Sequence, residues 1–139
     1  MKRLWTSIAV AAFTLLATHS TALAEVIDSG HTTTTNVVTN PCDTADGPIT
    51  ITTDTRWETR LQPDGTVVSH FHNHSEGVSA NGTKYIANRQ AINVTPIGST
   101  TAEVEVVIRR ISAGPGDNAV IRVTGTVPGA LTTSVSCGG

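Results

Sequence analysis

Residues 54–74 read DTRWETRLQPDGTVVSHFHNH, and this stretch decides how the rest of the chain is interpreted. Polar and apolar residues alternate on both sides of a central Pro-Asp-Gly, as expected for two strands joined by a turn. Pro63 suits the first position of a type I turn, and Gly65 suits the left-handed position that follows it. We therefore predict an antiparallel hairpin with a three-residue loop at 63–65.

A three-residue loop also fixes which residues lie opposite one another in this hairpin. Trp57 then faces Phe71, and Leu61 faces Val67, so that one face of the hairpin is apolar. A shift of one residue would give every side chain different cross-strand neighbours. The match of two aromatic residues supports the unshifted register.

The opposite face carries three of the five histidines of the chain, at every second position. Alternate residues of a strand share one face. The predicted cross-strand pairs are His70 with Glu58, His72 with Arg56, and His74 with Asp54. If the apolar face forms the core, the histidines meet water.

The next turn extends the register. Asn81-Gly82 is typical of a two-residue hairpin turn, which would place Gly77 opposite Ile86. Residues 86, 92 and 94 would then join the Trp57 face, whereas Tyr85 and residue 89 would lie on the histidine face. On the following strand, alternation predicts Val104, Val106 and Ile108 inside, and Glu103, Glu105 and Arg109 outside.

The whole chain has the composition of strands. Threonine and valine are abundant, glycine and proline recur at short intervals, and no window shows a sustained helical period. We expect seven or eight strands in one all-β domain, residues 25–139. The predicted architecture is a small antiparallel up-and-down β-barrel, with a two-sheet β-sandwich as the alternative.

The first residues are typical of an export signal. Lys2 and Arg3 precede the apolar run IAVAAFTLLA at 8–17, and Ala22-Leu23-Ala24 is a cleavage signal, so we predict a signal peptide over 1–24. The apolar run is too short to span a bilayer, so no membrane insertion is expected. Acidic residues outnumber basic ones, 11 to 9, and no basic stripe suggests nucleic acid as a partner.

The chain contains two cysteines, Cys42 and Cys137. In an exported chain a pair of cysteines is expected to form a disulfide, and the Cys-x-x-Cys spacing typical of metal sites is missing. This bridge would join the start of the domain to its last strand, which favours closure into a barrel. We expect the mature protein to be secreted, either to the periplasm or outside the cell.

The histidine row is also a candidate metal site. His70 and His74 lie about 13 Å apart on an extended strand, so one ion cannot bind all three histidines. Two histidines and a carboxylate could bind a divalent metal, either as His70, His72 and Glu58 or as His72, His74 and Asp54. Arg56 lies among these groups and would repel a cation. A solvated face that responds to pH explains the same residues.

Catalysis has less support in the sequence. The nucleophile-elbow, zinc-protease and phosphate-loop motifs are missing. His72 beside Asp54 or Glu58 could act as a base, but such neighbours more often form structural pairs. Trp57 and Phe71 are expected in the core. Tyr85, expected on the polar face, is the better candidate for contact with a ligand.

Two motifs and the terminal cysteine resemble a family of uncharacterised secreted bacterial proteins. These proteins share an Asn-Pro-Cys start, as at 40–42, a segment like "HF-x-x-QGVSG...GTKY", and a C-terminal Cys. The residues that match the second motif are His72, Gly77, Val78, Ser79, Gly82, Thr83, Lys84 and Tyr85. The chain departs from it at Glu76, His70 and His74. The resemblance covers most of residues 36–137 and implies export and a β-barrel, but no activity.

We therefore expect an exported, non-catalytic binding protein with no required cofactor. Its ligand and oligomeric state are not predicted. The tentative ligand-binding residues are His70, His72, His74, Glu58, Arg56 and Tyr85. One alternative is a small-ligand carrier or enzyme that uses a barrel cavity. The other is a surface protein that binds a divalent metal through the histidines at 70–74.

Overall fold

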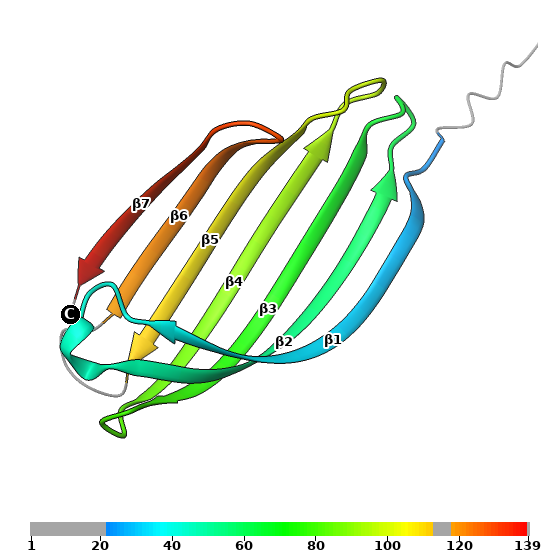
Figure 1. The fold of residues 1–139 in the computed structure, drawn as a ribbon. Coiled ribbons are helices and arrows are strands. Elements are labelled where there is room, and N and C mark those ends of the chain that lie inside the picture. Colours follow the sequence, from blue (N-terminus) through cyan, green and yellow to red (C-terminus); the bar gives the residue numbers. More distant parts are fainter. Residues whose placement is uncertain (1–21, 113–117, 139) are drawn as a thin grey trace, which may run out of the picture.

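The computed structural model describes residues 22–112 and 118–138 and consists of one antiparallel sheet (Figure 1). The predicted leader, apart from residues 22–24, lies outside the described residues. The strands follow one another in chain order, β1-β2-β3-β4-β5-β6-β7. Their bounds are β1 Glu25–Thr39, β2 Pro48–Leu61, β3 Val67–Ser79, β4 Lys84–Thr95, β5 Ala102–Ser112, β6 Asn118–Val127 and β7 Leu131–Gly138, with a short 3₁₀ helix η1 at Thr44–Asp46.

The β2–β3 hairpin has the predicted loop and register. Gly65 has a φ of 83°, and its N–H donates to the carbonyl oxygen of Gln62 at 2.9 Å. The carboxylate of Asp64 accepts a hydrogen bond from the N–H of Thr66. Trp57 lies opposite Phe71, and all three predicted histidine pairs are present. Turn chemistry and cross-strand matching therefore gave the correct register here.

The β3–β4 turn is not the predicted two-residue turn, and its register is shifted by one residue. The loop spans 80–82, closed by a hydrogen bond from the N–H of Ser79 to the carbonyl oxygen of Thr83. A type I′ turn requires a positive φ at both central residues. Gly82 has a φ of 86°, but no non-glycine residue in the described chain has a positive φ. Gly77 therefore lies opposite Tyr85 rather than Ile86.

This shift exchanges the faces of β4. Ile86, Ile92 and Val94 lie on the histidine face, contrary to prediction, and Ile86 is 47% exposed. Tyr85 and Arg89 lie on the Trp57 face instead. On β5 the predicted sorting is correct, because Val106 pairs with Ala91 on the Trp57 face. We call the Trp57 side of the sheet the inner face and the histidine side the outer face.

The sheet curls but does not close. β1 and β7 are its two edges, so the predicted barrel is not confirmed, although the all-β antiparallel fold is. Figure 1 shows β1 and β2 bending so that the β1–β2 connection lies beside the end of β7. There the predicted disulfide between Cys42 and Cys137 joins the two segments. The sheet is thus a half-barrel whose two edges are held together at one end.

The buried apolar core lies near this joined end. It consists of four residues on β2 and β4, with Val38 of β1 packed against them: Ile49, Ile51, Tyr85 and Ala87. Toward the other end, Trp57 and Phe71 are only half-buried. The concave inner face therefore packs most tightly at one end, although Ala91 and Val106, in the row of Trp57 and Phe71, are also buried.

Candidate functional site

The histidine row lies on the outer, convex face of the half-barrel. His72 and His74 are exposed, and His70 is half-buried. Across the strand boundary, Arg56 is exposed and Glu58 is half-buried. The structure thus brings these tentative ligand-binding residues together on one face, but that face is turned away from the concave side.

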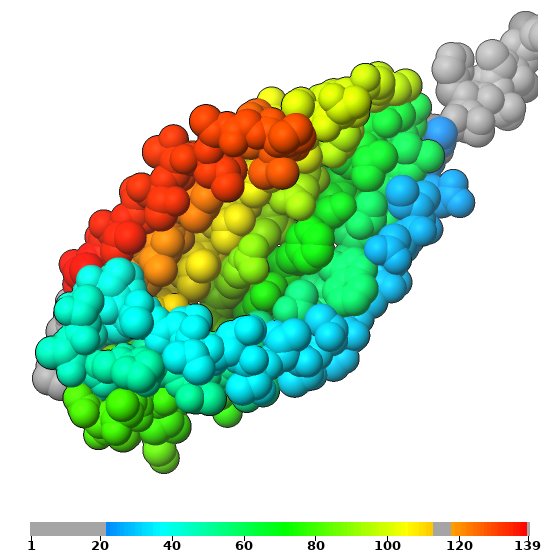
Figure 2. Space-filling model, in the orientation of Figure 1, coloured from blue at the N-terminus to red at the C-terminus, as the bar shows by residue number. Residues whose placement is uncertain are grey.

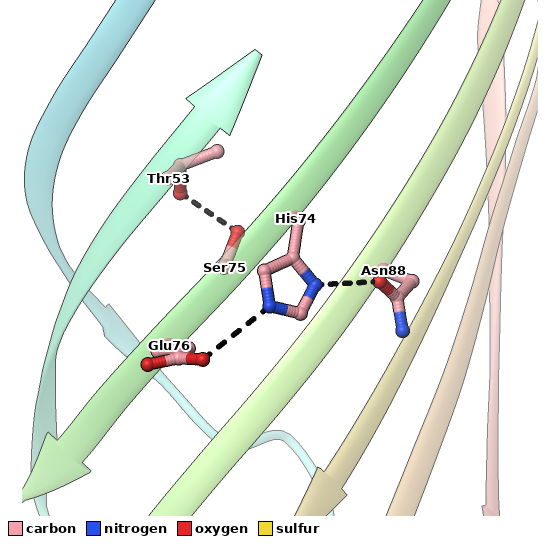
Figure 3. Close-up of polar contacts among 5 residues, drawn as sticks. All are labelled: Thr53, His74, Ser75, Glu76 and Asn88. Carbon is pink, nitrogen blue, oxygen red and sulfur yellow. Dashed lines mark hydrogen bonds and ion pairs between the residues drawn. The ribbon is translucent and has the colours of Figure 1, made fainter.

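His74 makes the best-defined polar contacts of this row (Figure 3). Its Nδ1 lies 2.9 Å from Oδ1 of Asn88, and its Nε2 lies 3.5 Å from Oε1 of Glu76. Both partners are oxygen atoms, so both ring nitrogens donate only when the imidazole is protonated. The hydrogen bond to Asn88, followed by the one to Glu76, raises the pKa of His74 above its ordinary value of 6.5.

The tentative metal site is not assembled in the structure. Glu58 accepts a hydrogen bond from Nε of Arg60, which lowers the pKa of its carboxyl group. In the range 22–112 and in 118–138, no group of three or more His, Cys, Asp or Glu side chains is placed to hold a metal ion. Glu58, the carboxylate of the predicted set His70, His72 and Glu58, is thus paired with Arg60 instead.

Tyr85 is not on the polar face, as the sequence predicted, but is 1% exposed on the inner face. Its hydroxyl donates to Oδ2 of Asp46 at 2.6 Å, and it lies 3.3 Å from Nδ2 of Asn40. Thr83 donates to the other carboxylate oxygen of Asp46 at 2.9 Å. The hydrogen bond that Tyr85 donates is the main cause of the lowered pKa of Asp46. Tyr85 is therefore part of a structural network and no longer a candidate for ligand contact.

The same network closes one end of the half-barrel. The segment at 40–47, which links β1 to β2, packs over the end of the sheet and is tied to β7 by the disulfide. Asn81 donates to the carbonyl oxygen of Ala45, and Arg110 on β5 donates through Nη1 to the carbonyl oxygen of Thr39. We call this segment the cap. The Asn-Pro-Cys motif lies in the cap, and the Gly-Thr-Lys-Tyr motif contacts the cap through Thr83 and Tyr85, which both donate to Asp46.

Beyond the cap, the inner face is hollow. Figure 2 shows the hollow between β1 in cyan and the orange-red strands β6 and β7. A cavity of about 320 Å³ lies on the inner face of β1 to β5, and we call it the trough. Its lining consists of Thr34, Asn36, Val38, Ile51, Thr53, Thr55, Asn73, Ser75, Ala87, Arg89, Ile108 and Arg110.

Two buried polar atoms of the trough residues have no hydrogen-bond partner. They are Oδ1 of Asn73 and Nε of Arg110. Buried polar atoms in folded proteins are nearly always paired, so an unpaired one needs a functional or structural reason. Arg110 itself is only 7% exposed. Both atoms belong to residues that line the trough, but neither atom is itself accessible to solvent.

Other hollows occur on the outer face, and two of them have mostly exposed linings. One of about 670 Å³ lies over residues 50–52, 76–78 and 84–86. Another of about 440 Å³ lies over the histidine row, beside Asp54 and Arg56. In contrast, nine of the twelve trough residues are buried or half-buried. The trough is thus the hollow with the most buried lining among those described here.

Sequence reasoning did not single out Arg110 or Asn73. A signal for Arg110 was present, because it follows Val104, Val106 and Ile108 in the same alternation. A charged residue at an otherwise apolar inner position is uncommon and marks a special environment. Asn73 follows Phe71 on the inner face of β3, between two histidines that point outward.

The described residues include no helix that is long and apolar enough to cross a membrane. Comparison of the chain with protein-family models, with curated proteins and with solved structures gives no match.

Proposed function

We propose that this protein is an exported, non-catalytic binding protein that holds a small ligand in the trough. The observation that carries the proposal is a hollow of about 320 Å³ on the concave face, with a mostly buried or half-buried lining that includes Arg110. Oδ1 of Asn73 and Nε of Arg110 are buried without a hydrogen-bond partner, and a ligand would reach them only if these side chains turned toward the trough. The disulfide supports export, because such bonds persist in oxidising compartments.

The alternative of an enzyme that uses the histidines has less support. His72 and His74 project from the face opposite the trough, so they cannot act on a ligand bound there. A surface metal site would have to recruit Glu58 away from Arg60. Metal analysis of the purified protein, with His72→Ala as the control, tests that alternative, and stoichiometric zinc, copper or nickel in the wild type alone would favour it.

Binding in the trough can be tested by thermal shift. The probes are small carboxylates, phosphate esters, amides and monosaccharides, because a ligand that binds only the folded state raises Tm. Thr55→Trp places a large side chain in the trough, whereas Thr50→Trp places the same side chain on the outer face of the same strand. Circular dichroism confirms that both variants fold.

If the trough binds a ligand, at least one probe should raise Tm in the wild type and in Thr50→Trp but not in Thr55→Trp. If no probe class raises Tm, or if Thr55→Trp keeps the full shift, the trough is not a binding site.

A further inference from the structure

Arg110 is a buried cation that has no counter-charge among the residues that the structure describes. The residue is 7% exposed, and no carboxylate in the described part of the chain forms an ion pair with it. Its only hydrogen bond within those residues runs from Nη1 to the carbonyl oxygen of Thr39, and Nε has no acceptor. Burial lowers the pKa of this guanidinium, which reflects the cost of removing the charge from water.

Within the described part of the chain, the residues that line the trough around Arg110 add positive charge and no negative charge. Arg89, one rung along on β4, also lines the trough, and no Asp or Glu does. The carboxylate of Asp46, in the cap, accepts hydrogen bonds from Tyr85 and Thr83. An unpaired buried charge is strongly unfavourable unless another group compensates it. The trough therefore suits a ligand that brings the missing negative charge.

The inner face changes character beyond the trough, where Trp57 and Phe71 lie. Arg110 shares a cross-strand row with Ala87, and the row that contains Trp57 and Phe71 lies two rows farther from the cap. Successive rows on one face are two residues apart along each strand, so the row of Arg110 and the row of Trp57 are about 13 Å apart. A molecule with an anionic end near Arg110 could therefore extend its apolar part toward the aromatic pair.

We infer that the trough binds a small amphiphilic molecule through an oxyanion group, a carboxylate or a phosphate ester, that is held by the guanidinium of Arg110. This inference rests on the proposed function. A planar guanidinium can donate two parallel hydrogen bonds to such a group, a geometry that a lysine cannot reproduce. Arg89 adds a second, exposed positive charge beside the site.

Isothermal titration with three matched probes tests this inference. The probes are 3-phenylpropanoate, phenyl phosphate and the neutral 3-phenylpropanamide. We expect at least one anion to bind about tenfold more tightly than the amide, as expected for a charge-assisted hydrogen bond in place of a neutral one. The probe that binds better distinguishes a carboxylate ligand from a phosphate ligand.

Variants assign the effect to Arg110. Arg110→Met should weaken binding of the preferred anion about tenfold or more while leaving amide binding within about twofold. Arg109→Met is the matched control, because Arg109 is the adjacent, exposed residue on the outer face of β5. If Arg110→Met does not fold, Arg89→Met, at an exposed position, should still weaken anion binding severalfold without affecting the amide.

The outcomes separate the inference from the proposed function. Tight binding of the amide that Thr55→Trp abolishes, with no preference for either anion, overturns the anion site but leaves the trough as a binding site. Equal loss of anion binding in Arg109→Met and in Arg110→Met also overturns the anion site. No binding of either anion would overturn the anion site, and the proposed function would fall with it only if none of the thermal-shift probes raised Tm either.

Discussion

Trp57 lies directly opposite Phe71, and its indole ring also covers Gly30 on the neighbouring strand β1. Nε1 of Trp57 donates to Oδ2 of Asp28 at 2.9 Å, which fixes the ring over the edge strand. The aromatic pair thus ties three strands together on the inner face, at the open end of the half-barrel. A side chain at position 30 would compete with the indole for the same space.

Gly30→Ala is expected to destabilise the fold by about 1–3 kcal/mol, the usual cost of overpacking. A Cβ at this position would overlap Cζ2 of Trp57, so the ring would have to move away from Asp28. Urea unfolding, followed by tryptophan fluorescence, measures the change. Gly138→Ala is the control, because a Cβ there meets nothing within 4 Å. Equal stability of the two variants would contradict this packing.

The β2–β3 hairpin was predictable because two independent signals agreed. Pro63 and Gly65 specified the loop, and the match of Trp57 with Phe71 specified the same register. The disulfide was also predictable, because a chain with an export-like leader and two cysteines leaves one expected pairing. Local chemistry was sufficient wherever the deciding contacts lie within one hairpin or one bond.

The β3–β4 register was not predictable from local chemistry. Asn81-Gly82 favours a two-residue turn, but the amide of Asn81 donates to the carbonyl oxygen of Ala45, 36 residues away. That contact belongs to the cap, which exists only after β1 and β2 have folded onto the sheet. The wrong prediction that Tyr85 lies on the polar face has the same cause, because a shift of one residue reverses the face of every side chain on β4.

Closure of the sheet was not predictable for a similar reason. A meander of strands is compatible with a closed barrel and with an open half-barrel, and only pairing between β1 and β7 distinguishes them. The alternation on β5 placed Val104, Val106 and Ile108 correctly inside. Extending it by one step would have drawn attention to Arg110, the residue that now carries the proposed anion site.

Removal of the disulfide should cost the most stability. Cys42 and Cys137 are 95 residues apart, and a loop of that size corresponds to about 4.7 kcal/mol in the chain-entropy model. The double variant Cys42→Ala and Cys137→Ala should therefore unfold at much lower urea concentration than the wild type. Thiol titration of the unfolded, unreduced wild type should find no free cysteine. Two free thiols, or an unchanged free energy of unfolding, would contradict the prediction.

Tyr85→Phe is expected to destabilise the protein by about 1–3 kcal/mol, because a buried acceptor loses its donor. The lost hydrogen bond is the one from the Tyr85 hydroxyl to the Asp46 carboxylate. Urea unfolding at pH 7 measures the change, and Thr50→Val, on the exposed face of β2, is the control. A cost no larger than that of the control would show that the cap does not depend on this hydrogen bond.

The same hydrogen bond predicts a dependence on pH. It lowers the pKa of Asp46 below its ordinary value of 3.8, so the folded state favours the ionised carboxylate. The stability that this group contributes is complete above pH 3.8 and declines as the pH falls through the lowered pKa. The difference between wild type and Tyr85→Phe should therefore shrink in acid. A difference that stays constant down to pH 2 would contradict the assignment.

His74 should show the opposite dependence on pH. Its pKa is raised by Asn88 and Glu76, so the folded state favours the protonated imidazole. The resulting stability is fully present below pH 6.5 and is lost as the pH rises through the folded pKa. His74→Gln should therefore be destabilised at pH 5.5 relative to its effect at pH 8.5. Because the side chain is 54% exposed, the difference should be about 0.5 kcal/mol or less.

Proton NMR titration of the imidazole signals provides the direct measurement, with His74→Gln used to assign the resonance. Asn88→Ala removes the largest cause of the shift and should bring the pKa of His74 back toward 6.5, whereas Gln90→Ala, two residues along the same face of β4, should leave it raised. A wild-type His74 that titrates at or below 6.5 would show that the oxygen atoms of Asn88 and Glu76 do not stabilise its charged form.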